Sequence, residues 1–157
     1  MFKLRFAEGC EPAYMTEHSA AADLVAREAA LLPPGKVVLV PAGVWIDSVE
    51  WAQVPTGFLP ELQVRARSGL ARKASISLAN GIGTIDADYR DEVGVLLINH
   101  GEEAFIINQG DRLAQMVLNL VARIPGLPVG GERKGGFGST LVSTPSSMMD
   151  IRESGNI

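Results

Sequence analysis

The distribution of glycine and proline constrains the fold of this chain more than any other feature of its sequence. The chain has 157 residues, and its 17 glycines and 9 prolines are scattered between short apolar runs. Such a pattern predicts many turns and therefore many short strands, as in a barrel or a jelly roll. A hydrophobic content of 46% over this length suits a single well-buried core. We therefore expect one all-β, jelly-roll-like β-barrel domain.

The expected elements are mostly strands. One short helix is expected at residues 68–74, where Ser68 can cap a run of good helix formers. Residues 20–30 are rich in helix formers but are soon followed by Pro33 and Pro34, so they could form a short helix or a strand with a polar loop. The candidate strands are residues 3–7, 36–41, 43–47, 62–65, 76–78, 83–86, 92–99, 104–107 and 114–120.

The charge and the cysteine content bear on compartment and partners. A net charge of -4 provides no overall field to attract nucleic acid or an anionic membrane. No run of residues approaches the length of a membrane span, and the alternating apolar and basic residues 1–6 do not resemble a signal peptide. The one cysteine, Cys10, excludes an intrachain disulfide and suits a reducing compartment. We expect a cytoplasmic protein with a structural thiol and with no nucleic-acid or membrane partner.

Residues 84–90 hold the densest polar chemistry of the chain, with two acids, one aromatic residue and one base between apolar runs. In an extended segment Asp86 and Asp88 share one face, while Ile85 and Tyr89 lie on the other. If Ile85 enters the core, Asp86 faces a pocket. The alternative is a tight hairpin whose aspartates only satisfy turn amides.

Residues 65–73 form a second candidate site. Ser68 and Gly69 lie at the expected start of the helix, where free amides and the positive helix end favour phosphate oxygens. Arg67 could add a two-pronged contact, and the Ser68 hydroxyl could donate to an oxygen that gains charge. An ordinary helix cap with solvated bases is the alternative.

Two further stretches carry polar groups in unusual settings. Gln115 lies within an apolar run and must find partners once buried, either in the fold or in a ligand, while Asp111 and Arg112 could simply pair. Residues 135–140 combine glycines, an aromatic ring and two hydroxyls. This composition suits a segment that closes over a flat base while its amides and hydroxyls hold phosphates.

In combination these stretches resemble the five ordered motifs of the trimeric deoxyuridine triphosphatase (dUTPase) family. The resemblance implies a homotrimer with shared active sites, in which residues 1–129 form the β-barrel domain and residues 130–157 a flexible C-terminal arm. It also implies hydrolysis of dUTP to dUMP and pyrophosphate, with water attacking the α-phosphorus and Mg²⁺ held by the triphosphate. The five motifs are residues 20–24, 67–71, 83–90, 110–115 and 135–140.

The resemblance also implies a role for individual residues. Asp86 would be the catalytic base, Ser68 would stabilise the leaving group, and Asp23 would hold Mg²⁺ through its water shell. Tyr89 would pack beneath the deoxyribose and exclude a 2′-hydroxyl. The remaining substrate-binding residues would hold the uracil and the phosphates: Arg67, Gly69, Asn80, Gly83, Gln115, Arg133, Phe137, Gly138 and Ser139. Of these, Asn80 would bind the uracil, and Phe137 would stack over it in a closed state.

Two other functions remain open at this point. The first is a dCTP deaminase-related enzyme of the same fold, but those enzymes carry a glutamate where this chain has Leu96, which cannot shuttle protons. The second is a non-catalytic nucleotide-binding trimer. In that case the altered sequence of the arm would be the sign of lost turnover. Glu132 stands where the family usually has an arginine, and Arg133 lies one residue closer to Phe137.

Overall fold

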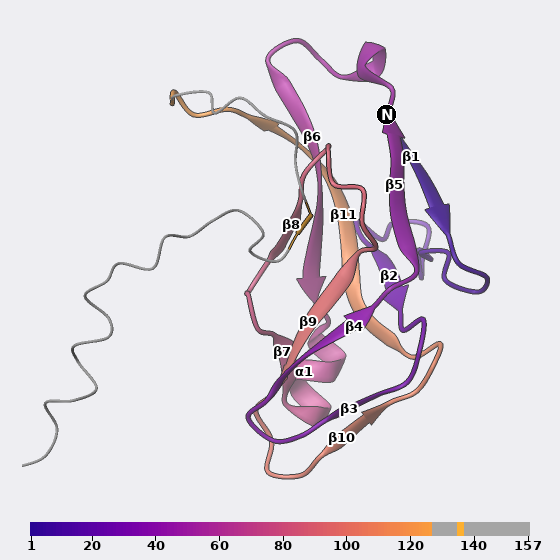
Figure 1. The fold of residues 1–157 in the computed structure, drawn as a ribbon, viewed down its shortest axis with the longest axis vertical. Helices are drawn as coiled ribbons and strands as arrows, with labels where there is room; N and C mark the ends of the chain where they lie inside the picture. Colours follow the sequence, from indigo (N-terminus) through magenta and orange to yellow (C-terminus); the bar gives the residue numbers. More distant parts are fainter. Residues whose placement is uncertain (127–134, 137–157) are drawn as a thin grey trace, which may run out of the picture.

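The protein is mostly β, as expected from its turns (Figure 1). The computed structural model describes residues 1–126 and 135–136. The helix α1 (Ser68–Ala74) confirms the expected helix, and a 3-10 turn, η1 (Trp51–Gln53), was not expected. The strands are β1 (Phe2–Phe6), β2 (Ala22–Val25), β3 (Ala30–Leu32), β4 (Val37–Pro41), β5 (Val44–Val49), β6 (Phe58–Ala66), β7 (Ile76–Leu78), β8 (Gly83–Ile85), β9 (Gly94–Asn99), β10 (Phe105–Ile107) and β11 (Arg112–Ala122).

Hydrogen bonding groups the described strands into four sheets. A four-stranded sheet has the order β2-β11-β6-β8, a three-stranded sheet has the order β4-β9-β7, and β1-β5 and β10-β3 form two pairs. All of these pairings are antiparallel. The ambiguous residues 20–30 contain strand β2, and the first residue of β3 ends that stretch.

The core lies where strands from different sheets turn their apolar side chains toward one another. Leu24 from β2, Ile46 from β5 and Leu97 from β9 are almost completely buried in one cluster. Fully burying one such side chain contributes about 1.5–3 kcal/mol, so this cluster is the main source of stability. Cys10 is also buried, and this burial raises the pKa of its thiol, which agrees with a structural role.

The four-stranded sheet positions several of the candidate site residues. Asp23 is on β2, Gln115 is on β11, and these two residues are directly paired across the sheet. Strand β6 leads through Arg67 into α1, and β8 leads into the turn that holds Asp86. One sheet therefore positions residues that are far apart in the sequence.

One end of this sheet leaves apolar side chains in water. Phe58 at the start of β6 is 44% exposed, and Leu118 and Leu120 on β11 are 44% and 37% exposed. Ile124, just after β11, is 87% exposed. In Figure 1 this last part of β11, drawn in orange, runs outward from the other strands. We call these four residues the apolar ribbon end.

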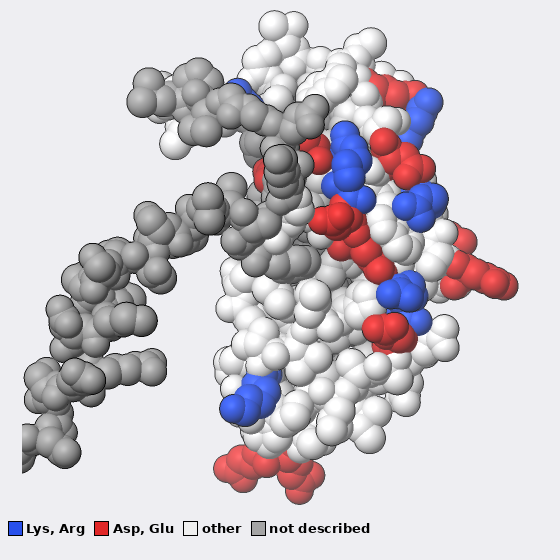
Figure 2. All heavy atoms as spheres, viewed as in Figure 1, with Lys and Arg blue, Asp and Glu red and all other residues white. Residues whose placement is uncertain are grey.

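The visible charges are mixed in sign. Figure 2 shows acidic and basic side chains side by side on the part of this face where β1 and β5 lie. Lys3 and Glu50 form one ion pair there, and Arg5 and Asp47 form another. This face therefore presents no broad field of a single sign. Among the described residues, no helix is long and apolar enough to cross a membrane.

Candidate active site

The turn after β8 presents two aspartates on one side and two apolar residues on the other. Asp86 and Asp88 are exposed, whereas Ile85 is 8% and Tyr89 is 4% exposed. The backbone N–H of Tyr89 donates to the carbonyl of Asp86 at 3.0 Å, which closes the turn. The alternation expected from the sequence is therefore confirmed, because the buried residues hold the turn while the acids face outward.

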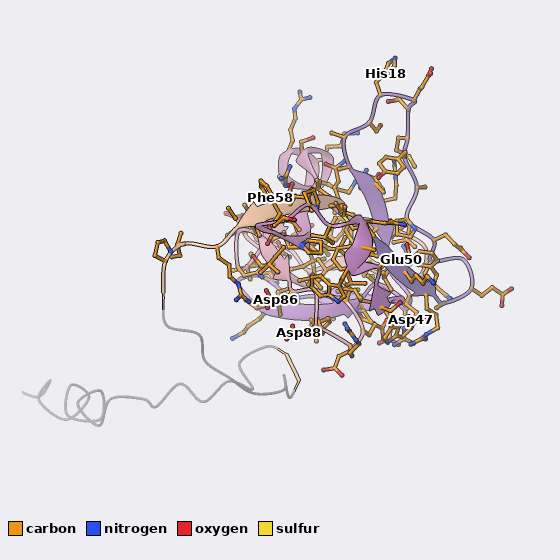
Figure 3. All side chains as sticks on the ribbon, turned by 90° about the horizontal axis from the view of Figure 1, so that it is seen from above. His18, Asp47, Glu50, Phe58, Asp86 and Asp88 are labelled. Carbon is orange, nitrogen blue, oxygen red and sulfur yellow. The ribbon has the colours of Figure 1, made fainter. Side chains whose placement is uncertain are left out.

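Both aspartates line a recess of about 390 Å³. Figure 3 shows Asp86 and Asp88 close together, on the side of the molecule away from His18. The recess also contains Glu61 of β6 and Arg123 beyond β11, and it is lined in full by Trp51, Leu59, Pro60, Glu61, Asp86, Ala87, Asp88, Val121 and Arg123. We call this the acidic recess, because three carboxyl groups face a single arginine.

Tyr89 is fixed at the end of the same turn. Its hydroxyl donates to the backbone carbonyl of Glu92 at 2.9 Å. A glycine of the C-terminal arm, Gly136, passes so close that a Cβ placed on it would lie 2.6 Å from Cε2 of Tyr89. Gly136 therefore lies against Tyr89 of its own chain.

A second group of site residues surrounds Asp23, which is 3% exposed. One carboxylate oxygen, Oδ2, lies 3.4 Å from Nε of Arg67 and 3.1 Å from Nη1 of Arg112. The other oxygen, Oδ1, accepts a hydrogen bond from Nε2 of Gln115 at 3.0 Å. Two arginines and one amide therefore converge on one buried carboxylate. We call Asp23, Arg67, Arg112 and Gln115 the arginine cluster.

Ser68 and Gly69 lie beside this cluster, in a recess of about 190 Å³ that they share with all four of its residues and with Met15. Ser68 is the first residue of α1, and the N-cap position belongs to Arg67, without a side-chain cap bond. The expectation that Ser68 caps the helix is wrong. Its hydroxyl makes no hydrogen bond to any other residue in the described parts of the chain, so it is available to a ligand.

The two recesses have no lining residue in common. The structure therefore brings Asp23, Arg67, Ser68, Gly69 and Gln115 together, and it places Asp86 in the other recess. Asn80 is exposed in the loop before β8, and the Cα of Gly83 is packed against Val64, where an added Cβ would lie 3.1 Å from the Cβ of Val64. Four predicted residues lie outside the described residues: Arg133, Phe137, Gly138 and Ser139.

Sequence reasoning missed several residues that line these recesses, among them Arg112 and Trp51. A simple pair between Arg112 and Asp111 was one possibility, but Arg112 contacts Asp23, and Asp111 accepts hydrogen bonds from Asn108 in a local turn instead. The register of β11 against β2 brings Arg112 there, and no sequence spacing could show that register. Trp51 lines the acidic recess from η1, a segment with no capping signal in the sequence.

The donor set around Asp23 determines what it can hold. Among the described residues there is no group of three or more His, Cys, Asp or Glu side chains placed to hold a metal ion. Two arginines against one carboxylate leave a positive balance, which suits phosphate oxygens better than a bare cation. Asp23 therefore fits the expected contact with Mg²⁺ only through water, with the phosphates as the direct ligands.

Comparisons with known proteins identify the family to which this fold belongs. The sequence model of the dUTPase family matches residues 8–141. The solved dUTPase of Streptococcus mutans is 26% identical, with a TM-score of 0.67 over 78% of this chain and 98% of that one. A mutant dUTPase from phage phi11 of S. aureus, described with a structural Mg(II) ion, shares the fold at 21% identity, with a TM-score of 0.64 over 86% and 99% of the two chains. Staphylococcus bacteriophage 80alpha dUTPase shares the fold at 18% identity, with a TM-score of 0.64 and the same coverage. The chain therefore belongs to the dUTPase family, enzymes that hydrolyse dUTP.

Proposed function

We propose that the chain converts dUTP to dUMP and pyrophosphate at sites formed where copies of the chain meet in a homotrimer. The observation that carries this proposal is the separation of the motif residues into two recesses, one acidic and one rich in arginine. Hydrolysis of the nucleotide requires both recesses, because it needs a proton-accepting group near the α-phosphorus and cations around the phosphates. A neighbouring copy supplies the missing half if its arginine cluster faces the acidic recess.

In this mechanism Asp86 orients a water molecule and accepts its proton as the oxygen attacks the α-phosphorus. The P–O bond to the β-phosphate breaks, and pyrophosphate leaves with the electron pair. A positioned base of this kind contributes about 10²–10⁴-fold to the rate. The exposure of Asp86 beside buried Ile85 supports the assignment, because the carboxylate follows directly on a buried strand residue and still faces an open recess.

The arginine cluster would receive the phosphates. Arg67 and Gln115 direct donors at Asp23, and phosphate oxygens would compete for the same donors. Gly69 would let the backbone approach a phosphate closely, and the free hydroxyl of Ser68 would donate to the oxygen that gains charge on the leaving pyrophosphate. Without substrate, the carboxylate of Asp23 therefore accepts from the donors that the phosphate oxygens would use.

Mg²⁺ would be held by the triphosphate and, through its water shell, by Asp23. When bound it would neutralise phosphate charge and favour departure of the pyrophosphate. The protein's own part would be to orient the phosphates, since Arg67, Arg112 and Gln115 all contact a single buried carboxylate. Removing Mg²⁺ should therefore reduce turnover while leaving this part of the fold intact.

The hairpin between Asn80 and Tyr89 would recognise the nucleoside. Asn80 and backbone groups near Gly83 would bind the uracil, and cytosine would leave such fixed groups unpaired because its 4-position reverses donor and acceptor. Tyr89 would lie beneath the deoxyribose and leave no space for a 2′-hydroxyl. Its burial and its fixed hydroxyl support this role, since a mobile ring could not exclude one oxygen atom.

We further propose the domain division and the location that follow from this function. Residues 1–129 would form the jelly-roll-like barrel of each copy, and residues 130–157 the arm. On the arm, Arg133 would contact phosphate, Phe137 would stack over the uracil, and Gly138 and Ser139 would hold phosphates. The enzyme would act in the cytoplasm on free dUTP, with no nucleic-acid or membrane partner.

A pyrophosphate-release assay with dUTP, UTP and dCTP, each with and without Mg²⁺, tests the proposal. We expect strong preference for dUTP and dependence on Mg²⁺. Equal turnover of the three nucleotides would contradict the proposed base and sugar recognition. Release of ammonia from dCTP would instead indicate a deaminase, and tight binding of dUTP without turnover would indicate a non-catalytic trimer.

A further inference from the structure

We propose that Arg27 and Glu92 are positioning residues that hold Tyr89 in place and thereby set the preference of the enzyme for deoxyribose over ribose. The inference rests on the proposed role of Tyr89 beneath the sugar. Neither Arg27 nor Glu92 lines the acidic recess or the recess of the arginine cluster. Their effect would act through the ring of Tyr89.

The first step is the bond between Tyr89 and the backbone of Glu92. The Tyr89 hydroxyl donates to the Glu92 carbonyl at 2.9 Å, so the far end of the ring is tied to that backbone position. The near end is fixed by the turn, where the N–H of Tyr89 donates to the carbonyl of Asp86. The ring is therefore held at both ends, and its position depends on where the carbonyl of Glu92 lies.

The second step is the anchoring of Glu92. One oxygen of its carboxylate, Oε1, accepts hydrogen bonds from Nε of Arg27 and from the backbone N–H of Gly43, each at 2.8 Å. The side chain of Glu92 is only 21% exposed and that of Arg27 is 38% exposed, so the pair is partly shielded from water. The hydrogen bond to Glu92 raises the pKa of Arg27, as expected for a close ion pair.

The third step is that both partners of Glu92 are themselves held by other parts of the chain. The backbone N–H of Arg27 donates to the carbonyl of Pro41 at 2.9 Å. Gly43 has a φ of +65°, and a Cβ placed on it would lie 2.7 Å from the Cβ of Cys10, so only glycine fits there. The carboxylate of Glu92 is thus bound to two fixed points on separate parts of the chain.

The backbone beyond Glu92 is fixed in the same way. Val93 donates to the carbonyl of Val44 at 2.8 Å, and its own carbonyl accepts from the N–H of Ala42 at 3.0 Å. On the other side of Tyr89, Nη1 of Arg90 donates to the carbonyls of Ala87 and Tyr89, each at 2.9 Å. These backbone contacts and the Arg27–Glu92 pair together restrict the position of the Tyr89 ring. We call them the frame of Tyr89.

Such a frame matters because the proposed selection concerns one hydroxyl group. A ring that excludes a 2′-hydroxyl must keep its position within a fraction of an ångström, and a misplacement of about 1 Å can cost about 100-fold in rate. Loosening the frame would give a ribose more room and would also weaken the contact with the deoxyribose. UTP should then lose less turnover than dUTP, or should gain some.

The test compares kcat/KM for dUTP with kcat/KM for UTP in the full-length protein. In Arg27→Ala and Glu92→Ala the ratio of the two values should fall by about 10-fold. In Glu92→Gln the ratio should stay near that of the wild type, because the amide oxygen can still accept from Arg27 and Gly43. Arg27→Lys should recover part of the ratio. Parallel losses for both nucleotides, which a purely structural role predicts, would overturn the inference.

Two further measurements separate the routes by which the ratio could change. Tyr89→Phe removes the bond to the Glu92 carbonyl, so adding Arg27→Ala to that variant should change the ratio little. A full additional loss would show that Arg27 acts by another route and would overturn the inference. Arg5→Ala is the matched control, because Arg5 also pairs with a carboxylate, Asp47, at 3.3 Å, but on β1. It should leave the ratio unchanged.

The same data distinguish this inference from the proposed function. A wild-type enzyme that hydrolyses dUTP and UTP equally well would contradict the role of Tyr89 itself. A selective wild type with equally selective Arg27→Ala and Glu92→Ala variants would leave the proposed function standing and would overturn only the frame. Circular dichroism and the thermal midpoint of each variant show whether the fold is retained.

Discussion

The carboxylates of the acidic recess and of the arginine cluster have opposite environments. Asp23 is buried and has both oxygens engaged by arginines and an amide, whereas Asp86 is exposed in a recess with two more acids and one arginine. In the proposed mechanism the chain therefore separates the group that would accept a proton from the cations that would bind phosphate, and a neighbouring copy would reunite them.

The largest effect should follow from neutralising the exposed acid. Asp86→Asn keeps the shape of the side chain but removes the base, so kcat should fall by about 10²–10⁴-fold while binding of dUTP is largely kept. Pyrophosphate release and equilibrium binding measure the two quantities. Asp88→Asn, in the same recess, is the matched control and should have a much smaller effect. Equal losses in both variants would mean that the recess acts only through its total charge.

Mixing two inactive variants tests whether the two recesses belong to one site. Asp86→Asn and Ser68→Ala, unfolded and refolded together in equal amounts, would combine at random in a shared-site trimer. About a quarter of the sites would then contain an intact Asp86 from one copy and an intact Ser68 from another. Turnover should rise to roughly that fraction of wild type. No recovery beyond the separate variants would place the whole site within a single chain.

Removing the charge of the buried acid should affect stability. In Asp23→Asn the two arginines lose their carboxylate partner, so the free energy of unfolding should fall by about 1–3 kcal/mol. Urea titration of the variant and the wild type measures this difference. Asp47→Asn, an exposed partner of Arg5, should change stability by less than about 1 kcal/mol. Equal small changes would show that burial gives Asp23 no special role.

The smallest effect concerns the arginine that sequence reasoning missed. Arg112 is 47% exposed, so water would weaken its proposed contact with phosphate. In Arg112→Gln the KM for dUTP should rise by about two- to fivefold, with kcat nearly unchanged. Arg72→Gln, on the exposed surface of α1, is the control. An unchanged KM in Arg112→Gln would restrict the phosphate site to Arg67, Ser68 and Gln115.

The sequence predicted most of the elements because their patterns are local. The helix at residues 68–74 and the alternation around Asp86 follow from propensity and periodicity, and both are confirmed. Strand β3 was missed because only three residues pair, Leu31 is exposed and Pro33 follows directly. Strand β6 was expected to start at residue 62 because Pro60 interrupts the run. Pro60 is tolerated because β6 pairs there only with β11, and β8 joins it from Leu62 onward.

The site was predicted less completely, because its contacts depend on register. Gln115 was expected to find a partner, and the pairing of β11 with β2 provides Asp23. The same pairing takes Arg112 away from its neighbour Asp111, which no local rule shows. The frame around Tyr89 joins residues 65 positions apart, Arg27 and Glu92. The motif residues could be recognised in the sequence, but the groups that hold them in place could not.

The apolar ribbon end has a consequence for the life of a newly made chain. Phe58, Leu118, Leu120 and Ile124 are exposed to water in a single copy, and an exposed apolar surface of this kind is suited to contact with another protein surface. Until such a contact forms, a newly made chain would carry these side chains uncovered. Fast association between copies of the chain would therefore protect the protein from aggregation. Slow synthesis or strong dilution would prolong the time during which these apolar side chains are exposed.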